Sequence, residues 1–279
     1  MKLTEKRFST PLGEICYWTN SLDDRRLTLV FLPGLTADHR LFEPQLPFFA
    51  DQFNVLVWDA PGHGASRPFS LHFTLADKAR WLEAILTREN VTRPVLIGQS
   101  MGGYVSQMLI ELFPDRALGF ISIDSAPLQR RYITAAEIWL LKRMYPVYRY
   151  YPWKALLKAA AEGCSTTAYG RQLMREITSV YKREEYCALS AHGMRILAEA
   201  MESDLSFEIS CPARLICGER DMAGSAKSYN RRWAKQSGIP VHWIQGAGHN
   251  ANTDCPQIVN EIILELLKEI DRQKETSLN

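Results

Sequence analysis

Short apolar runs alternate with helical stretches along most of this chain, and no other feature of the sequence restricts the fold as strongly. The runs RLTLVFL at 26–32, FNVLVWD at 53–59, PVLIGQS at 94–100 and LGFISID at 118–124 have the length and β-branched content of buried strands. Helical periodicity follows the second run at 75–88 and the third at about 101–113. Strands that alternate with helices predict an α/β fold with a mostly parallel sheet flanked by helices.

The alternation stops between residues 129 and 204, where the pattern is helical and rich in aromatic residues. It resumes with strands at 211–219 and 240–245, a helical stretch through Trp233 and a closing helix over about 256–268, and then a frayed tail, DRQKETSLN. We therefore predict one α/β core, residues 1–128 and 205–279, that carries a helical cap inserted at 129–204.

Charge and cysteine content exclude several classes of protein. The 33 basic and 31 acidic residues are interspersed, so we expect no nucleic-acid partner. The six cysteines show neither the close pairing of zinc sites nor the density of a disulfide scaffold, so we expect free thiols in a reducing compartment. The N-terminus lacks an apolar targeting segment and no run is long enough to cross a membrane. We expect a cytoplasmic protein without a membrane partner, of open oligomeric state.

A G-x-S-x-G motif, Gly98 to Gly102, lies where a predicted strand meets a predicted helix. This position between a strand and a helix is more informative than the residue pattern alone, because a sharp strand-to-helix turn needs glycines on both sides of the serine. It also places Ser100 at a helix N-terminus, where free N–H groups favour negative charge. Ser100 is therefore the candidate nucleophile.

A serine hydroxyl needs a base to accept its proton and a carboxylate to orient that base. His249 lies in the small-residue loop GAGHNA after the last predicted strand and is the candidate base. Asp221 follows the strand LICGE and is the preferred acid, because functional groups of open α/β sheets lie at the carboxyl ends of strands. Asp124, at the end of ISID, is the alternative acid.

Taken together, FLPGL, WDAPGHGAS, IGQSMGG, CGERD and GAGHN resemble the α/β-hydrolase superfamily, in its capped esterase branch. The resemblance covers about 26–127 and 207–270. It implies the chain order Ser100, Asp221, His249 for a catalytic triad, and an oxyanion hole formed by the N–H groups of Leu35 and Met101. It also implies cleavage of a small or medium carboxylic ester, or a lactone or thioester. Because no His, Asp or Glu cluster has metal-ligand spacing and no G-x-G-x-x-G follows a predicted strand, we expect no cofactor or metal ion.

Several weaker signals have two interpretations. Asp59 and His63 in WDAPGHGAS are expected to shape a loop, and His39 to fix the loop after the first parallel strand or to line the substrate entrance. Pocket-lining candidates in the cap are Trp139, Met144, His192 and Met194. The aromatic segment at 144–153 either walls an apolar pocket or packs the cap against the sheet. The small excess of basic residues in the cap favours a solvated face over a site for carboxylates.

Three other activities stay open on this sequence. Carbon–carbon bond hydrolases of dienone acids share the fold and commonly show the S-M-G-G run that begins at Ser100. Some hormone receptors keep the triad with slow turnover, and a lyase could use the same serine without an acyl-enzyme. The sequence does not identify the acyl group, the alcohol or the pathway, because function resides in sites rather than folds.

Overall fold

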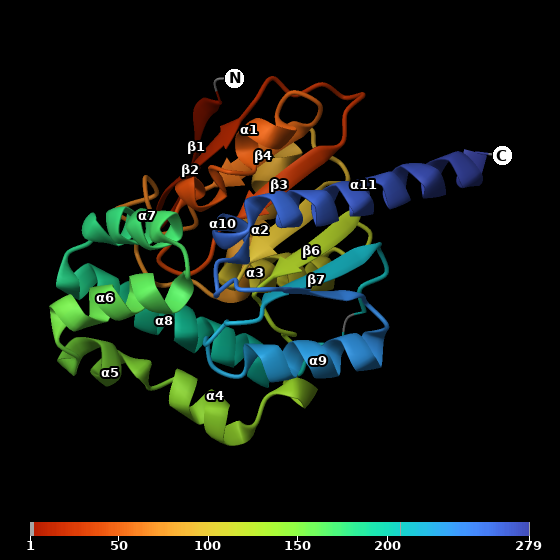
Figure 1. The fold of residues 1–279 in the computed structure, drawn as a ribbon. Helices are drawn as coiled ribbons and strands as arrows, with labels where there is room; N and C mark the ends of the chain where they lie inside the picture. The colour runs from red at the N-terminus through yellow and green to blue at the C-terminus, as the bar shows by residue number, and fades with distance from the viewer. Residues whose placement is uncertain (1–2, 207, 279) are drawn as a thin grey trace.

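The computed structural model describes residues 3–206 and 208–278. One eight-stranded sheet forms its centre, in the order β1-β2-β4-β3-β5-β6-β7-β8 (Figure 1). Its strands are β1 (Thr4–Thr10), β2 (Gly13–Thr19), β3 (Thr28–Leu32), β4 (Asn54–Trp58), β5 (Val95–Gln99), β6 (Gly119–Ile123), β7 (Ala213–Gly218) and β8 (Val241–Ile244). All neighbours from β4 to β8 are parallel, which confirms the mostly parallel sheet.

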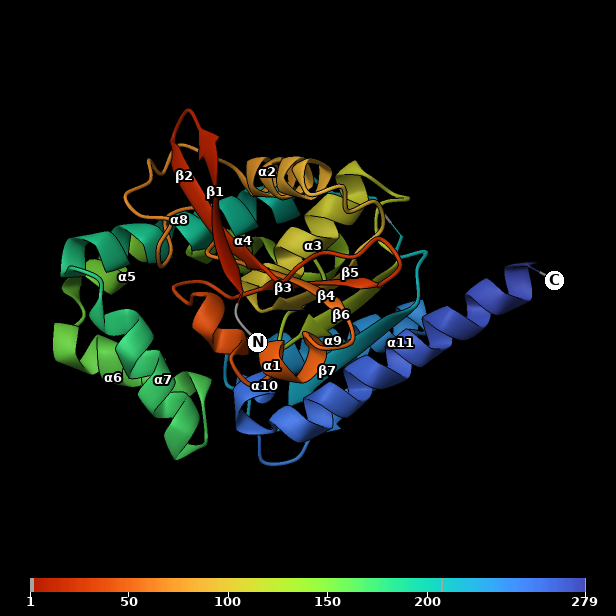
Figure 2. The same ribbon diagram turned by 90° about the horizontal axis from the view of Figure 1, so that it is seen from above.

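Helices cover both faces of this sheet. The core carries η1 (His39–Phe42), α1 (Leu46–Phe49), α2 (Leu75–Arg88), α3 (Met101–Leu112), α9 (Ala226–Ser237), α10 (Ala251–Asp254) and α11 (Pro256–Leu278). Alternate residues of a buried strand point to opposite faces. Val30 and Leu32 therefore join the cluster under α2, α3 and α9, whereas Leu29 and Phe31 join the cluster under α1 and α11. Figure 2 shows these layers from above.

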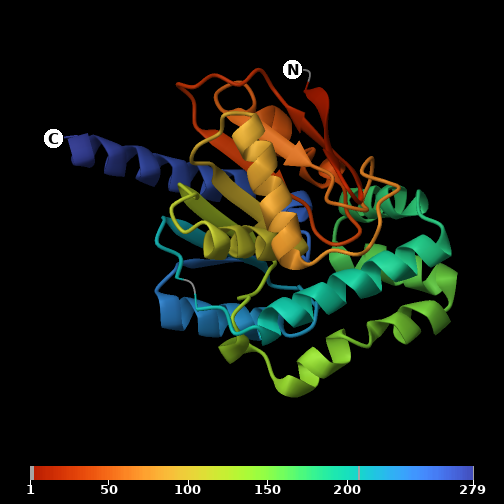
Figure 3. The ribbon, with the colours of Figure 1, turned by 180° about the vertical axis from the view of Figure 1, so that it is seen from behind.

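Between β6 and β7 the chain is helical. The elements are η2 (Arg130–Tyr132), α4 (Ala135–Leu141), α5 (Met144–Tyr150), α6 (Trp153–Cys164), α7 (Ala168–Ser179) and α8 (Arg183–Glu202). Figure 3 shows this layer beyond the end of the sheet, with α8 between α4 and the sheet. Helix α8 packs closely on the core, because a Cβ at Gly193 would lie 2.4 Å from Leu35 Cδ1. None of the described helices combines the length and apolarity needed to cross a membrane.

Two features of the fold differ from the sequence prediction. The antiparallel hairpin of β1 and β2 was not predicted, because its outer strand is largely exposed and polar and gives no apolar run. The closing helix was predicted to end near residue 268, with a frayed tail after it. Instead α11 continues to Leu278, so the tail prediction is wrong over 271–278, and residue 279 lies outside the described residues.

Candidate active site

Ser100 occupies a strained turn between β5 and α3. Its backbone has φ 49° and ψ −115°, in the left-handed region that non-glycine residues seldom adopt. The flanking glycines are required by close approach: a Cβ at Gly98 would lie 2.4 Å from the backbone of Gly102, and one at Gly102 would lie 1.8 Å from Leu32 O. The turn holds the hydroxyl of Ser100 at the wall of a cavity.

The fold brings His249 and Asp221 to this serine from distant parts of the chain. His249 Nε2 lies 2.9 Å from Ser100 Oγ, and His249 Nδ1 lies 3.1 Å from Asp221 Oδ1. Both aspartate and histidine are on loops that follow neighbouring parallel strands, β7 and β8. The three side chains therefore form a continuous hydrogen-bonded chain from carboxylate to hydroxyl.

The charge of Asp221 sets the basicity of His249. Burial lowers the pKa of His249, but the hydrogen bond and charge of Asp221 more than compensate, so the pKa lies above its usual value of 6.5. Asp221 is 2% exposed, and its Oδ1 also accepts a hydrogen bond from Ala223 N at 2.8 Å. A buried carboxylate that is fixed in this way orients the imidazole and stabilises its protonated form.

Asp124, the alternative acid, lies beside Asp221 but bonds elsewhere. Its Oδ1 accepts from Gly218 N at 2.7 Å and its Oδ2 from Ala251 N at 2.9 Å. Burial, followed by the charge of Asp221, raises the pKa of Asp124 well above its usual value. The sulfur atom of Cys217 lies within 4.8 Å of a carboxylate oxygen of Asp124 and of one of Asp221. Asp124 thus links the end of β7 to the loop of His249 rather than contacting the histidine ring.

Two residues that the sequence analysis did not consider also support the loop of His249. The side-chain amide of Gln99 donates to His249 O at 2.8 Å. Asp254 Oδ2 accepts from Gly248 N at 2.8 Å and from Thr166 N at 3.0 Å, which ties the loop to the turn between α6 and α7. No sequence signal identifies Gln99, because the variable position of G-x-S-x-G accepts many side chains.

A cavity of about 410 Å³ opens at Ser100, within the usual size of small-molecule sites. Leu35 and Met101 line it. Among the described residues no hydrogen-bond acceptor is found for the N–H of either residue, and Met101 is the first residue of α3, where N–H groups lack helical partners. Two backbone donors are therefore free beside the serine hydroxyl.

The helices between β6 and β7 close the apolar part of this cavity. Leu140 and Leu141 of α4 and Leu197 and Met201 of α8 contribute to its wall. Glu137 adds a carboxylate, which accepts a hydrogen bond from Tyr229 of α9. Within the described part of the chain, no lysine or arginine lines the cavity. The cavity is therefore apolar with a weakly anionic rim.

Of the five pocket-lining candidates from the sequence, Met194 lines the cavity and the other four do not. Trp139 is 58% exposed, with the Arg143 guanidinium 4.4 Å from its ring centroid. Met144 is the first residue of α5, none of whose residues is buried. The sequence reveals that these residues belong to the helical segment, but not the direction of each side chain.

His192 points into the protein rather than into the cavity. Its ring packs edge-on against the ring of Phe73, with 4.5 Å between the two centroids. The ammonium of Lys78 lies 5.6 Å from the centroid of the Phe73 ring. Burial lowers the pKa of His192 to about 3 and that of Lys78 to about 7. His63, completely buried, also has a pKa lowered by burial to about 3. Both histidines are therefore neutral at pH 7, and the nearby charge of Lys78 contributes to lowering their pKa.

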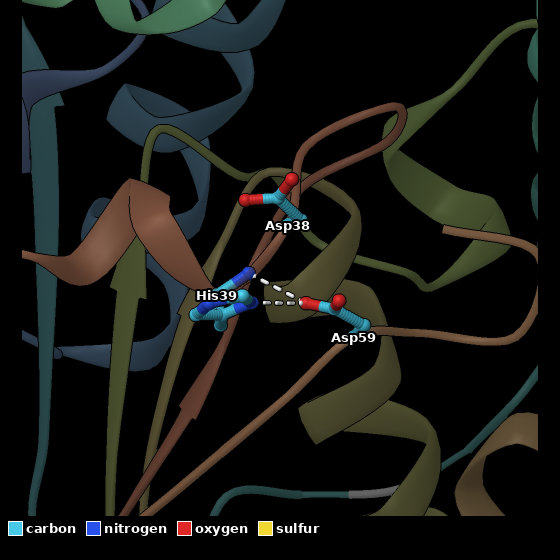
Figure 4. Close-up of side chains that lie close together, drawn as sticks. All are labelled: Asp38, His39 and Asp59. Carbon is cyan, nitrogen blue, oxygen red and sulfur yellow. Dashed lines mark hydrogen bonds and ion pairs between the residues drawn. The ribbon is translucent and has the colours of Figure 1, made fainter. Parts of the chain in front are cut away.

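His39 and Asp59 belong to a second group of polar side chains, shown with Asp38 in Figure 4. Asp59 Oδ1 lies 2.7 Å from His39 N and 2.9 Å from its Nδ1, and the ring stacks on Trp18. Asp38 binds Arg40, and Asp59 Oδ2 accepts from Ala65 N. Donor atoms of the three residues lie within 4.8 Å of one another, yet these bonds occupy the carboxylates and fix two loops.

Comparison with known proteins places this geometry in a family. Residues 29–262 match the alpha/beta hydrolase family, and the chain belongs to that family. It is 27% identical over 255 residues to a Salmonella paratyphi B protein named 2-succinyl-6-hydroxy-2,4-cyclohexadiene-1-carboxylate synthase, a match that covers 86% of this chain and 94% of the relative.

Solved structures show the same fold. A hydrolase from Pseudomonas aeruginosa superposes with a TM-score of 0.78 at 18% identity, covering 94% of this chain and 98% of the other. Est816, described as an N-acyl homoserine lactone degrading enzyme, superposes with a TM-score of 0.76 at 20% identity, covering 93% and 99% of the two chains. The chain therefore has the α/β-hydrolase fold, and at these identities the likeness shows the fold alone.

Proposed function

We propose that this protein is a serine hydrolase that cleaves small or medium carboxylic esters through an acyl-enzyme. The observation that carries the proposal is the hydrogen-bonded chain from Asp221 through His249 to Ser100. His249 accepts the serine proton as Ser100 Oγ attacks the carbonyl carbon, and it then protonates the departing alcohol. Water releases the acyl group in the same way, with His249 again as the base.

The N–H groups of Leu35 and Met101 serve in this proposal as the oxyanion hole. Both residues line the cavity at Ser100, and their N–H groups have no acceptor among the described residues. Donors placed where negative charge develops typically contribute about 3 kcal/mol each to transition-state stabilisation. In this proposal the helices from η2 to α8 act as a cap over this cavity.

The cavity favours a neutral, apolar substrate. Its wall carries leucine and methionine side chains, and among the described residues the acidic side chains that line it are those of Asp124 and Glu137. A substrate carboxylate there would lack a cationic partner among the described residues and would lie near an anion, which is unfavourable in an apolar site. An ester, lactone or thioester with an uncharged acyl group fits these contacts.

The relatives named as a synthase support a second candidate, a carbon–carbon bond lyase or hydrolase at the same serine. The name of these relatives describes a carboxylate, and the absence of lysine and arginine from the described cavity wall argues against such a ligand here. A receptor with slow turnover is the third candidate, because the geometry alone does not determine the rate.

The test is hydrolysis of p-nitrophenyl esters from acetyl to decanoyl by the wild type and by Ser100→Ala. We expect a chain-length optimum that the variant loses, with kcat reduced at least about 10⁴-fold. Ultraviolet loss on a carboxylated dienone without ester hydrolysis would favour the carbon–carbon enzyme. Saturable ligand binding with neither reaction would favour the receptor.

A further inference from the structure

One stretch of the cap differs from the rest of the surface in charge and aromatic content. Residues 138–161 contain no aspartate or glutamate but five basic residues, Lys142, Arg143, Arg149, Lys154 and Lys158. The same stretch holds six aromatic residues, Trp139, Tyr145, Tyr148, Tyr150, Tyr151 and Trp153. The whole chain has a net charge of only +2, so positive charge is concentrated here.

Many apolar side chains of this stretch face solvent. Trp139 is 58% exposed and Tyr150 is 83% exposed, and Leu140, Tyr145, Val147 and Tyr151 are each about half exposed. The inner sides of the helices are fixed to α8: Arg183 donates to Arg149 O at 2.7 Å, and Cys187 lies 3.3 Å from Tyr148 O. Figures 1 and 3 show α4 and α5 along the outer edge of the molecule, beyond α8.

This combination matches the chemistry of a lipid–water interface. Tryptophan and tyrosine concentrate at the level of lipid head groups, while arginine and lysine bury their stems and hold their charges towards anionic phosphates. Arg143 already has its guanidinium over the Trp139 ring. Contiguous exposed apolar side chains are uncommon on a monomeric soluble protein and mark interaction sites.

Part of the positive charge is available for such a contact. Lys142 is paired with Glu202, and Lys158 lies 3.9 Å from Glu162. Arg143, Arg149 and Lys154 have no acidic partner among the described residues. Each basic residue near an anionic membrane surface contributes about 1 kcal/mol to binding, so the surface prefers anionic to neutral lipid.

The exposed surface continues into the candidate active site. Leu140 is 50% exposed and also lines the cavity at Ser100. One turn earlier, Glu137 lines the same cavity and bonds to Tyr229 of the core. A lipid surface in contact with α4 would therefore lie beside the cavity wall, where an apolar ligand dissolved in the lipid could enter.

We propose that the outer side of α4 and α5, with the first turn of α6, docks on the surface of an anionic phospholipid bilayer. We call it the cap surface and define it by Trp139, Leu140, Arg143, Tyr145, Val147, Tyr150, Tyr151 and Lys154. Docking is peripheral and reversible. The sequence analysis expected no membrane partner because no segment could span a bilayer, a criterion that does not address surface binding.

The test is co-sedimentation of the full chain with vesicles, measured without any substrate. Vesicles of equimolar phosphatidylglycerol and phosphatidylcholine are compared with vesicles of phosphatidylcholine alone, at low and high salt. We expect binding to the anionic vesicles that salt weakens. Exchanging both Trp139 and Tyr150 for alanine should lower the partition coefficient at least about tenfold, and Lys154→Glu should lower it at least about fivefold.

Matched controls lie on the opposite side of the molecule. Phe48→Ala removes a half-exposed aromatic ring from α1, and Lys268→Glu reverses an exposed charge on α11. Both should bind vesicles as the wild type does. All exchanged side chains are exposed, so circular dichroism and the melting temperature should stay close to those of the wild type.

Three results would overturn the proposal. The first is no sedimentation with either kind of vesicle. The second is binding that the exchanges at Trp139, Tyr150 and Lys154 leave unchanged, which would place the contact elsewhere. The third is a concentration-dependent dimer that the Trp139 and Tyr150 exchange dissociates, without vesicle binding, which would make the cap surface an interface between two copies. None of these results bears on ester hydrolysis, so the two proposals fail separately.

Discussion

The side-chain amide of Gln99 donates a hydrogen bond to the backbone carbonyl of His249 at 2.8 Å and lies 3.1 Å from the Asn250 side-chain oxygen. The residue before the proposed nucleophile therefore holds the loop of the proposed base. Together with the bonds from Gly248 N to Asp254 and from Ala251 N to Asp124, this contact fixes the position of His249 relative to Ser100.

Gln99→Ala should lower kcat about tenfold or more with a small change in KM. Small displacements of a catalytic group are costly, and the lost hydrogen bonds should lower the free energy of unfolding by about 1 kcal/mol. Asn20→Ala is the control, since Asn20 is a buried amide that bonds Ala50 O and Phe53 O away from the site. Equal effects of both exchanges on kcat would contradict a positioning role for Gln99.

The two buried aspartates should have separable effects. Asp221→Asn removes the acceptor of the His249 ring and should lower kcat about 10⁴-fold while the fold is retained. Asp124→Asn leaves the ring contact intact but leaves either Gly218 N or Ala251 N without an acceptor. It should lower the free energy of unfolding by about 1–3 kcal/mol and reduce kcat much less.

Steady-state kinetics and urea unfolding of both variants provide the comparison, and each aspartate is the control for the other. A loss of about 10⁴-fold in Asp124→Asn alone would reverse the assignment of the acid. Near-equal reductions of kcat in the two variants would show that Asp124 and Asp221 act as one coupled unit.

The pH dependence of kcat/KM should have an acidic limb above pH 6.5. His249 accepts the serine proton only in its neutral form, and its folded-state pKa is raised above 6.5 by Asp221 despite burial. Activity should therefore fall as the pH drops through that raised value. A limb below pH 6, measured with an ester whose leaving group is insensitive to pH, would show that Asp221 does not support the charge of His249.

Met201 should set the length of the acyl chain. It is 3% exposed, lies in the last turn of α8 and lines the cavity. Met201→Ala enlarges the apolar end and should move the optimum of the p-nitrophenyl ester series towards longer chains. Met108→Ala, a buried methionine of α3 outside the cavity wall, should destabilise the fold by a comparable amount and leave the optimum unchanged. The same shift in both variants would indicate general loosening.

Lys78 should lower the stability of the fold at neutral pH. Burial lowers its pKa from 10.5 to about 7. Between these two values the unfolded state binds more protons than the folded state, so stability rises with pH, and the full cost is present below about pH 7. Lys78→Met should raise the free energy of unfolding by a few kcal/mol at pH 7, at about 1.4 kcal/mol per pKa unit, and remove the rise above it.

Urea unfolding at pH 6 to 10 measures both effects of the Lys78 exchange. Lys235→Met, which removes an exposed lysine of α9, is the control and should change neither the stability nor its pH dependence appreciably. Destabilisation by Lys78→Met would mean that the ammonium makes a favourable contact in the interior.

Local patterns predicted much of this fold. Each of the six strands of the parallel part lies within a predicted apolar run, and α2 covers the predicted residues 75–88. These elements could be read from the chain because buried parallel strands need continuous apolar side chains, and the helix has both periodicity and a Thr74 capping box. The motif around Ser100 is only partly local: Gly98 is required by the nearby backbone of Gly102, whereas Gly102 is required by the carbonyl of Leu32 on the neighbouring strand β3.

The sequence by itself determined the order of strands and helices in the parallel part of the sheet, the serine turn, and the placement of Asp124, Asp221 and His249 after strands that end at one edge of the sheet. Only the tertiary structure decided which aspartate faces His249, that Gln99 holds the histidine loop, and that Met194 lines the cavity whereas Trp139 faces solvent. The physical reason is distance along the chain. Residues 28 to 150 positions apart meet through packing of whole elements, and side-chain direction at such a contact leaves no periodic signal in the sequence.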